Sequence, residues 1–214
     1  GAGAAAPAPT EPPPPEAQEE QLEVEPVATE ASQSRALPDD LEEAAPPAVD
    51  VPPGTVRFSQ RSHGGVDLSV AGDARSRAAL GWGGSCWSEE EVSGAGPHRG
   101  VRFSCSLSHV MPGLKAGLPG RKDGYADLDY GLYCSPVGRV QVYERGVLMY
   151  TDALRISEGS ALELRIVNNA VEYVVDGRVA YTSQAQPQRP LHFAIAWHDH
   201  PAAVTNIQYT TKAG

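Results

Sequence analysis

The stretch from Asp127 to Ser183 decides the fold: DLDYGLYCSPVGRVQVYERGVLMYTDALRISEGSALELRIVNNAVEYVVDGRVAYTS. Runs of β-branched and aromatic residues alternate there with four short turn signals, namely Ser135-Pro136-Val137-Gly138, Arg145-Gly146, Asn168-Asn169 and Asp176-Gly177. Asn, Asp and Gly tolerate the positive φ angles that tight hairpins require. The stretch therefore predicts successive antiparallel hairpins.

The two-residue period of half-buried strands extends on both sides of this stretch. In Val101–Leu107, and again in Leu162–Ile166 and Leu191–Trp197, apolar side chains alternate with polar or small ones. We expect strands near residues 55–60, 66–70, 78–82, 99–109, 127–134, 139–144, 147–151, 160–167, 170–175, 178–183, 191–198 and 204–211. Because no segment holds a helical period for three turns, the chain is expected to be all-β.

About a dozen short strands in a body of single-domain size predict two antiparallel sheets packed face to face, as in a jelly-roll-like β-sandwich. The Gly-rich stretch from Pro112 to Tyr125 also carries Lys115, Arg121, Lys122 and Asp123. We expect it to be a long irregular loop, and long loops on rigid sandwiches commonly carry binding sites.

Acidic residues are concentrated at the start of the 214-residue chain. Residues 1–55 carry twelve Asp or Glu against the single Arg35, whereas the remainder has fifteen acids against sixteen Lys or Arg. An acidic, Pro- and Ala-rich segment cannot bury enough apolar surface to offset its ordering entropy. We therefore expect residues 1–52 to form a disordered or extended tail and residues 53–214 to form one β-sandwich domain.

Charge and hydropathy narrow the classes of partner. The body is nearly neutral, which argues against nucleic-acid binding because a phosphate backbone requires a clustered basic face. No apolar run approaches the ~18 residues of a membrane-spanning helix, so we expect membrane association only peripherally, through a protein complex. The chain begins at Gly rather than Met and is expected to be a processed product or a fragment, with any targeting peptide upstream.

Three cysteines, Cys86, Cys105 and Cys134, show no C-x-x-C spacing for zinc or redox chemistry, and at least one of them is unpaired. Cys105 and Cys134 are in phase with the apolar residues of their strands. We therefore expect both to be small buried hydrophobic side chains.

Five segments carry a family resemblance: Asp127–Tyr133 (DLDYGLY), Val140–Gly146 (VQVYERG), Leu162–Ile166 (LELRI), Val171–Gly177 (VEYVVDG) and Tyr181–Ser183 (YTS). In this order they resemble the concanavalin A-like lectin/glucanase superfamily and, more distantly, SPRY domains. The resemblance covers residues 55 to 214. It implies a sandwich of two curved sheets, since most of the matching positions are turn and core residues.

The resemblance raises the question of catalysis. Glucanases of the superfamily carry two glutamates that bracket an aspartate on one strand, because a retaining glycosidase needs a nucleophile and an acid about 5–5.5 Å apart. Here Asp127 and Asp129 share a face of the predicted strand at i, i+2, but no glutamate stands before or after them. We therefore do not expect an enzyme.

The most metal-like cluster is His198-Asp199-His200 at the end of a predicted strand. Two His at i, i+2 would project to one side and require further donors to hold a divalent ion. No partner motif supplies those donors, and the sequence lacks the metal loop of legume-type lectins. We expect solvated histidines, no metal and no cofactor.

Aromatic side chains are the remaining candidates for recognition. Several Tyr residues are out of phase with the aliphatic core, and Trp82 and Trp87 bracket a tight turn as anchors or as a lid. Rings stack on sugars while carboxylates bind hydroxyls, and the same groups suit a protein interface. The candidate ligand-binding residues are Asp123, Tyr125, Asp127, Asp129, Tyr133, His198 and His200.

The sequence therefore predicts a non-catalytic β-sandwich module that binds a glycan or a protein surface. One alternative is an accessory or scaffold subunit of a larger assembly, whose tail wraps neighbouring subunits. The other alternative is a degenerate β-glucanase-like hydrolase.

Overall fold

The computed structural model describes residues 53–59, 65–69, 72–117, 124–187 and 190–211. These residues form thirteen β-strands and one three-residue 3-10 helix, η1 (Tyr125–Asp127), which confirms the all-β prediction. The predicted tail, residues 1–52, lies outside the described residues, as do Arg121, Lys122 and Asp123 of the predicted loop. No helix in the described ranges is long and apolar enough to cross a membrane.

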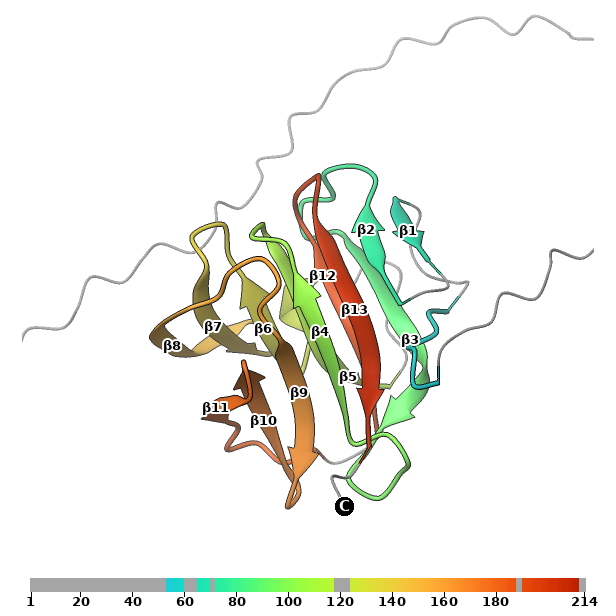
Figure 1. Ribbon diagram of the computed structural model, residues 1–214, viewed down its shortest axis with the longest axis vertical. Coiled ribbons are helices and arrows are strands. Elements are labelled where there is room, and N and C mark those ends of the chain that lie inside the picture. The colour runs from blue at the N-terminus through green and yellow to red at the C-terminus, as the bar shows by residue number, and fades with distance from the viewer. Residues whose placement is uncertain (1–52, 60–64, 70–71, 118–123, 188–189, 212–214) are drawn as a thin grey trace, which may run out of the picture. The chain divides into compact units, whose positions relative to one another are not determined.

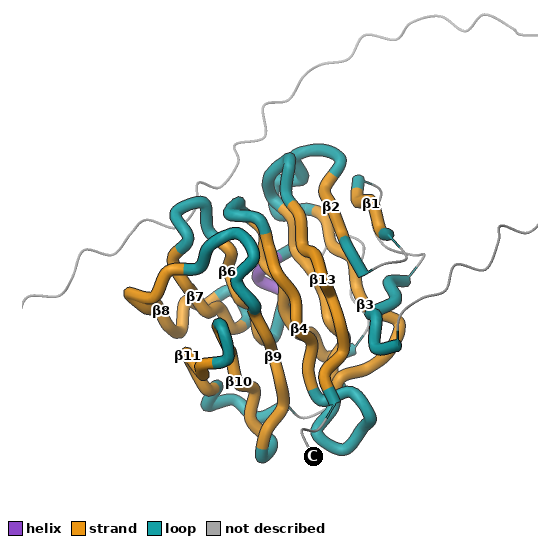
Figure 2. Tube along the Cα trace, viewed as in Figure 1, coloured by secondary structure: helices purple, strands orange, loops and turns teal. Residues whose placement is uncertain are grey.

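The strands form two antiparallel sheets (Figures 1 and 2), as predicted. The order in the seven-stranded sheet is β1 (Val66–Leu68), β2 (Ala74–Ser76), β13 (Ala203–Thr210), β4 (Gly100–Cys105), β9 (Leu162–Val167), β10 (Ala170–Val175) and β11 (Arg178–Thr182). The order in the six-stranded sheet is β3 (Gly84–Val92), β12 (Leu191–Trp197), β5 (Val110–Ala116), β6 (Tyr130–Cys134), β7 (Arg139–Glu144) and β8 (Val147–Arg155).

All four predicted turns connect neighbouring strands. They join β6 to β7, β7 to β8, β9 to β10 and β10 to β11. Arg145 and Gly146 have φ angles of 51° and 78°, and the Asn168-Asn169 and Asp176-Gly177 turns also have positive φ at both residues. The backbone conformation that the turn sequences favour is therefore the one that they adopt.

The core lies between the two sheets and receives alternate side chains from both. On β12, the inward-facing side chains of Leu191, Phe193, Ile195 and Trp197 are almost completely buried. Phe103 on β4 of the opposite sheet packs against Phe193, with ring centroids 5.4 Å apart. Burial of this apolar surface is the main favourable contribution that holds the sheets together.

The predicted loop from Pro112 is wrong in its first part, and the predicted strand 99–109 is too long. Strand β4 ends at Cys105, and residues 110–116 form β5 between β12 and β6. Gly113 suits this central strand because a Cβ atom there would lie 2.5 Å from the Tyr130 carbonyl oxygen. Pro112 is tolerated because the β5–β6 ladder has no pair at that residue. Proline and glycine, which indicate loops locally, here permit close strand packing.

Three further predictions at the edges of the strands are wrong. Residues 78–82 form a turn in which Gly81 and Trp82 have φ angles of 55° and 65°, and strands β2 and β3 lie on either side of it. The described part of the predicted strand 55–60, residues 55–59, has only isolated bridges at Thr55 and Phe58. Asp127 belongs to η1, so the predicted strand 127–134 begins only at Tyr130.

Cys105 and Cys134 form a disulfide, which corrects the prediction that both are simple buried hydrophobic side chains. Cys105 ends β4 and Cys134 ends β6, so the bond joins the two sheets. The sequence alone does not pair them, because their contact depends on the packing of one sheet on the other. Cys86 is free and buried, and burial raises the pKa of its thiol to about 12. This thiol is therefore unreactive at neutral pH.

Replacing both half-cystines by serine, C105S/C134S, is expected to lower the free energy of unfolding by about 3–4 kcal/mol, because a loop of about 30 residues no longer constrains the unfolded chain. Urea denaturation of the full chain without reductant measures this difference. Reductant should destabilise the native chain and leave the variant unchanged. Equal urea midpoints for the native chain and the variant, both without reductant, would contradict a disulfide between the two sheets.

Candidate functional site

The outer face of the six-stranded sheet carries a second apolar cluster, separate from the core between the sheets. Side chains alternate along a strand, so the residues between the core positions of β3, β12, β5, β6 and β7 point to this outer face. The buried floor of the cluster consists of Trp87, Met111, Leu128, Ala194 and Ala196. The partly buried rings that pack on this floor are Trp82, Tyr125, Tyr133 and Tyr143.

These four rings continue into two imidazoles, and we call the whole surface the aromatic patch: Trp82, His109, Tyr125, Tyr133, Tyr143 and His198. The Trp82 ring lies with its centroid 5.0 Å from that of Tyr125, 6.0 Å from that of Tyr133 and 5.2 Å from that of His198. Tyr143 meets Tyr125 and Tyr133 edge-on, at 6.0 Å from each. All six side chains are only partly buried, so the patch is accessible to a ligand.

Trp82 adopts a left-handed backbone conformation, with a φ angle of 65°. For a bulky residue this conformation is a true outlier and costs of order 1–3 kcal/mol. Backbone hydrogen bonds hold it in place: the Trp82 N–H donates to the Trp197 carbonyl at 2.9 Å, and the Gly81 N–H donates to the His198 carbonyl at 3.2 Å. The turn therefore maintains an unfavourable backbone geometry that places the indole in the patch.

Asp199, which lies two residues past the end of β12, forms hydrogen bonds with both histidines of the patch. Its Oδ1 accepts a hydrogen bond from His198 Nδ1 at 2.6 Å, and its Oδ2 accepts one from the His109 backbone N–H at 2.9 Å. Nδ1 of His109 is hydrogen-bonded in turn to the Tyr133 hydroxyl. Burial raises the pKa of Asp199, but the hydrogen bonds from His198 and His109 outweigh it, so the pKa lies below its ordinary value.

The prediction that His198 and His200 project to one side is wrong. Strand β12 ends at Trp197, so its alternation does not extend to these residues. His198 faces Trp82, whereas His200 Nδ1 lies 2.9 Å from the carbonyl oxygen of Ser76 on β2 of the other sheet. Within the described residues, no group of three or more His, Cys, Asp or Glu side chains is placed to hold a metal ion.

Asp127 and Asp129 line a hollow of about 470 Å³ at the corner formed by η1, β5 and β6. Asp127 Oδ2 accepts a hydrogen bond from the Gly124 N–H at 2.9 Å. Asp129 accepts one from the Ala116 N–H at 2.7 Å and another from Arg145 Nε at 2.9 Å. The predicted common strand face is wrong because Asp127 lies in η1, and both carboxylates stabilise the local backbone.

The structure brings together three of the seven predicted site residues, namely Tyr125, Tyr133 and His198. Asp123 lies outside the described residues, and ligand binding by all seven residues stays a prediction. Sequence reasoning missed His109 and Tyr143 as members of the patch. Tyr143 is out of phase with the core residues Val140 and Val142, so the pattern contained a signal for it. His109 lies in the bend before β5 and joins the patch only through tertiary contacts, so no local pattern indicated it.

The fold is a two-sheet β-sandwich that is also found in solved structures of other proteins. The chain is similar to the crystal structure of the TRIM65 PSpry domain, with a TM-score of 0.55 and 15% identity over 74% of this chain and 93% of that one. It is also similar to stonustoxin, with a TM-score of 0.53 and 10% identity over 72% of this chain but only 28% of the toxin chain. At these identities the likeness shows the fold alone.

No protein-family model matches the sequence, and no curated protein matches it. What the chain binds must therefore be argued from its own residues.

Asp199→Asn is expected to lower the free energy of unfolding at pH 7 by about 1 kcal/mol, because the partly exposed side chain loses its charge and one of its two accepting oxygens. The pKa of Asp199 is lowered in the folded chain. The carboxylate therefore contributes fully to the free energy of unfolding at pH values above the ordinary carboxyl pKa, and this contribution is lost as the pH falls through the folded-state pKa. Thermal unfolding of both proteins between pH 7 and pH 2 measures this. A difference that stays constant down to the lowest pH would contradict the assignment.

Proposed function

We propose that this chain is a non-catalytic binding module and that the aromatic patch is its ligand-binding surface. The observation that carries the proposal is Trp82, a bulky residue in a strained conformation among five other partly exposed rings. Backbone strain of this kind clusters at ligand clamps and active sites. Trp and Tyr side chains also contribute most of the binding energy at many interfaces.

The bonding of the carboxylates supports the non-catalytic part of the proposal. A retaining glycosidase needs two carboxyl groups that face one glycosidic bond. Asp127 lies in η1 and Asp129 in the bend that precedes β6, and Arg145 and the Ala116 N–H occupy both oxygens of Asp129. These bonds argue against the degenerate-hydrolase alternative.

A protein surface is the class of ligand that the patch supports best. Small-molecule sites are concave. None of the six rings lines the hollow of about 470 Å³ beside Asp127 or a second hollow of about 500 Å³ beside Arg99. A broad set of Trp, Tyr and His rings with polar tips is typical of the centre of a protein interface.

A glycan is the second candidate, because Tyr125 and Asp127 lie in the same 3-10 turn and Asp127 is exposed. A ring that stacks on a sugar beside a carboxylate that accepts its hydroxyl groups is a suitable pair for such a ligand. The accessory-subunit alternative depends on residues 1–52, which lie outside the described residues.

Trp82→Gly in the full chain is expected to reduce ligand binding at least about tenfold, because it removes the central ring of the patch. Glycine adopts the positive φ angle freely, so relief of strain offsets part of the lost packing and the free energy of unfolding falls by only about 1–2 kcal/mol. Binding is measured on a glycan array, with calcium and with a chelator, and by affinity purification from extracts of cells that produce the protein.

Val179→Ala is the matched control, because Val179 is 39% exposed and lies on β11 of the other sheet. A blank array, together with proteins that the native chain and the control retain but Trp82→Gly loses, would support a protein ligand. Array binding that Trp82→Gly loses would support a glycan. Equal binding by all three proteins would contradict the assignment of the patch.

A further inference from the structure

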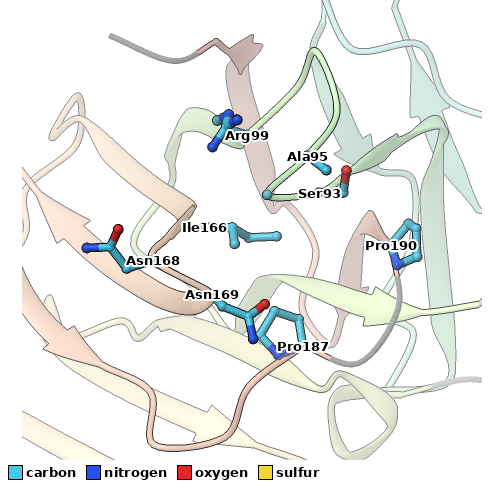
Figure 3. Close-up of a pocket in the computed structure, with 9 residues that line it drawn as sticks. Ser93, Ala95, Arg99, Ile166, Asn168, Asn169, Pro187 and Pro190 are labelled. Carbon is cyan, nitrogen blue, oxygen red and sulfur yellow. The ribbon is translucent and has the colours of Figure 1, made fainter.

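A hollow of about 500 Å³ lies between the loop from β3 to β4, the turn from β9 to β10, and the side chains of Pro187 and Pro190 (Figure 3). The side chains that decide its chemistry are those of Arg99, Ile166, Asn168, Asn169, Pro187 and Pro190. None of the residues of the aromatic patch lines it, so a ligand here would be independent of the proposed function.

Backbone hydrogen bonds fix the wall of the hollow that carries Arg99 and Ile166. The Arg99 N–H donates to the Thr210 carbonyl at 2.8 Å, and the Arg99 carbonyl accepts from the Ile166 N–H at 2.7 Å. His98 stacks on Tyr209, with ring centroids 4.0 Å apart. Arg99 is thus anchored on both sides to neighbouring strands, and little ordering of its backbone remains to oppose binding.

Within the part of the chain that the structure describes, no acidic group compensates the positive charge of the hollow. The Arg99 guanidinium is partly buried and makes no hydrogen bond or ion pair with any described residue, and no Asp or Glu is among the residues that line the hollow. Arg165 on β9 differs, because Glu172 lies 2.8 Å from its Nη2. A guanidinium with five free donors in a preformed hollow favours an anion with paired oxygens.

The remaining lining indicates which anion fits. One guanidinium balances the single charge of a carboxylate better than the higher charge of a phosphate. The two prolines are partly or fully exposed and offer apolar contact to an aliphatic stem, whereas Ile166 is only 3% exposed and belongs to the core. No aromatic ring lines the hollow, so an acidic sugar would lack a stacking partner.

The two asparagines add neutral polar groups at the rim. Asn168 and Asn169 both have positive φ angles in the turn from β9 to β10, and Asn169 Nδ2 donates to Gln186 Oε1 at 3.0 Å. The exposed Asn168 carboxamide has no hydrogen-bond partner among the described residues and can donate to a ligand.

We propose that this hollow binds a glutamate side chain of an acidic peptide segment in a partner protein. Arg99 holds the carboxylate through two parallel hydrogen bonds, and the aliphatic stem of the glutamate packs on Pro187 and Pro190. The site is separate from the aromatic patch and gives the module a second point of attachment.

Fluorescence anisotropy of a short labelled peptide of alternating glutamate and alanine, titrated with the full chain, tests the proposal. We expect Arg99→Gln to weaken binding about tenfold or more, and Arg99→Lys to weaken it less, because lysine keeps the charge but not the paired donors. A peptide with glutamine for glutamate should not bind. Melting temperatures of the variants confirm folding and should stay close to that of the native chain, since the Arg99 side chain makes no hydrogen bond or ion pair with the residues that the structure describes.

Arg102→Gln is the charge-matched control, because Arg102 is exposed on β4 only three residues away. It should leave the affinity for the acidic peptide unchanged, as should Trp82→Gly, which separates this site from the aromatic patch. An equal loss of affinity in Arg99→Gln and Arg102→Gln would mean that the net charge of the chain alone explains peptide binding, and would overturn the proposal. Absence of peptide binding, or binding only to an oligouronate added as an acidic-sugar probe, would overturn it as well.

Discussion

The central strands of the six-stranded sheet are buried on both faces, and the rest of the structure depends on this constraint. All seven residues of β12 are buried. The packing of the two sheets accounts for the inner face, so the outer face needs a covering of its own. The rings of the aromatic patch and the side chain of Leu128 provide that covering. The patch therefore stabilises the sheet and remains partly accessible from outside.

The elements that cover the outer face come from distant parts of the chain. The Trp82 turn is bonded to β12 through backbone hydrogen bonds, and Asp199 bonds the His198 side chain and the His109 backbone. Because several segments share these contacts, the patch depends on the complete sandwich and cannot be reproduced by one loop. This arrangement suits a preorganised binding surface, which loses little conformational entropy when a ligand binds.

Features that depend on neighbouring residues could be predicted from the sequence, whereas features that depend on contacts between distant segments could not. The turns at Arg145-Gly146 and Asp176-Gly177 were predictable because their residues tolerate positive φ angles. Strand β5 was missed because Pro112 and Gly113 indicate a loop unless the close approach to β6 is known. The same distinction holds for the site. The side of the sheet that Tyr133 faces could be predicted from the two-residue alternation along its strand. His109 joins the patch only through contacts between distant segments.

Photo-cross-linking from within the patch tests the central claim most directly. Benzoylphenylalanine is introduced in the full chain at position 82 or, for comparison, at position 179, and each protein is irradiated in an extract of producing cells. We predict that the chain with benzoylphenylalanine at position 82 forms a discrete cross-linked product with a ligand, and that an excess of native chain without the probe suppresses this product. The chain with the probe at position 179 should not form it. No competed species from position 82, or the same species from both positions, would contradict the assignment of the aromatic patch as the binding surface.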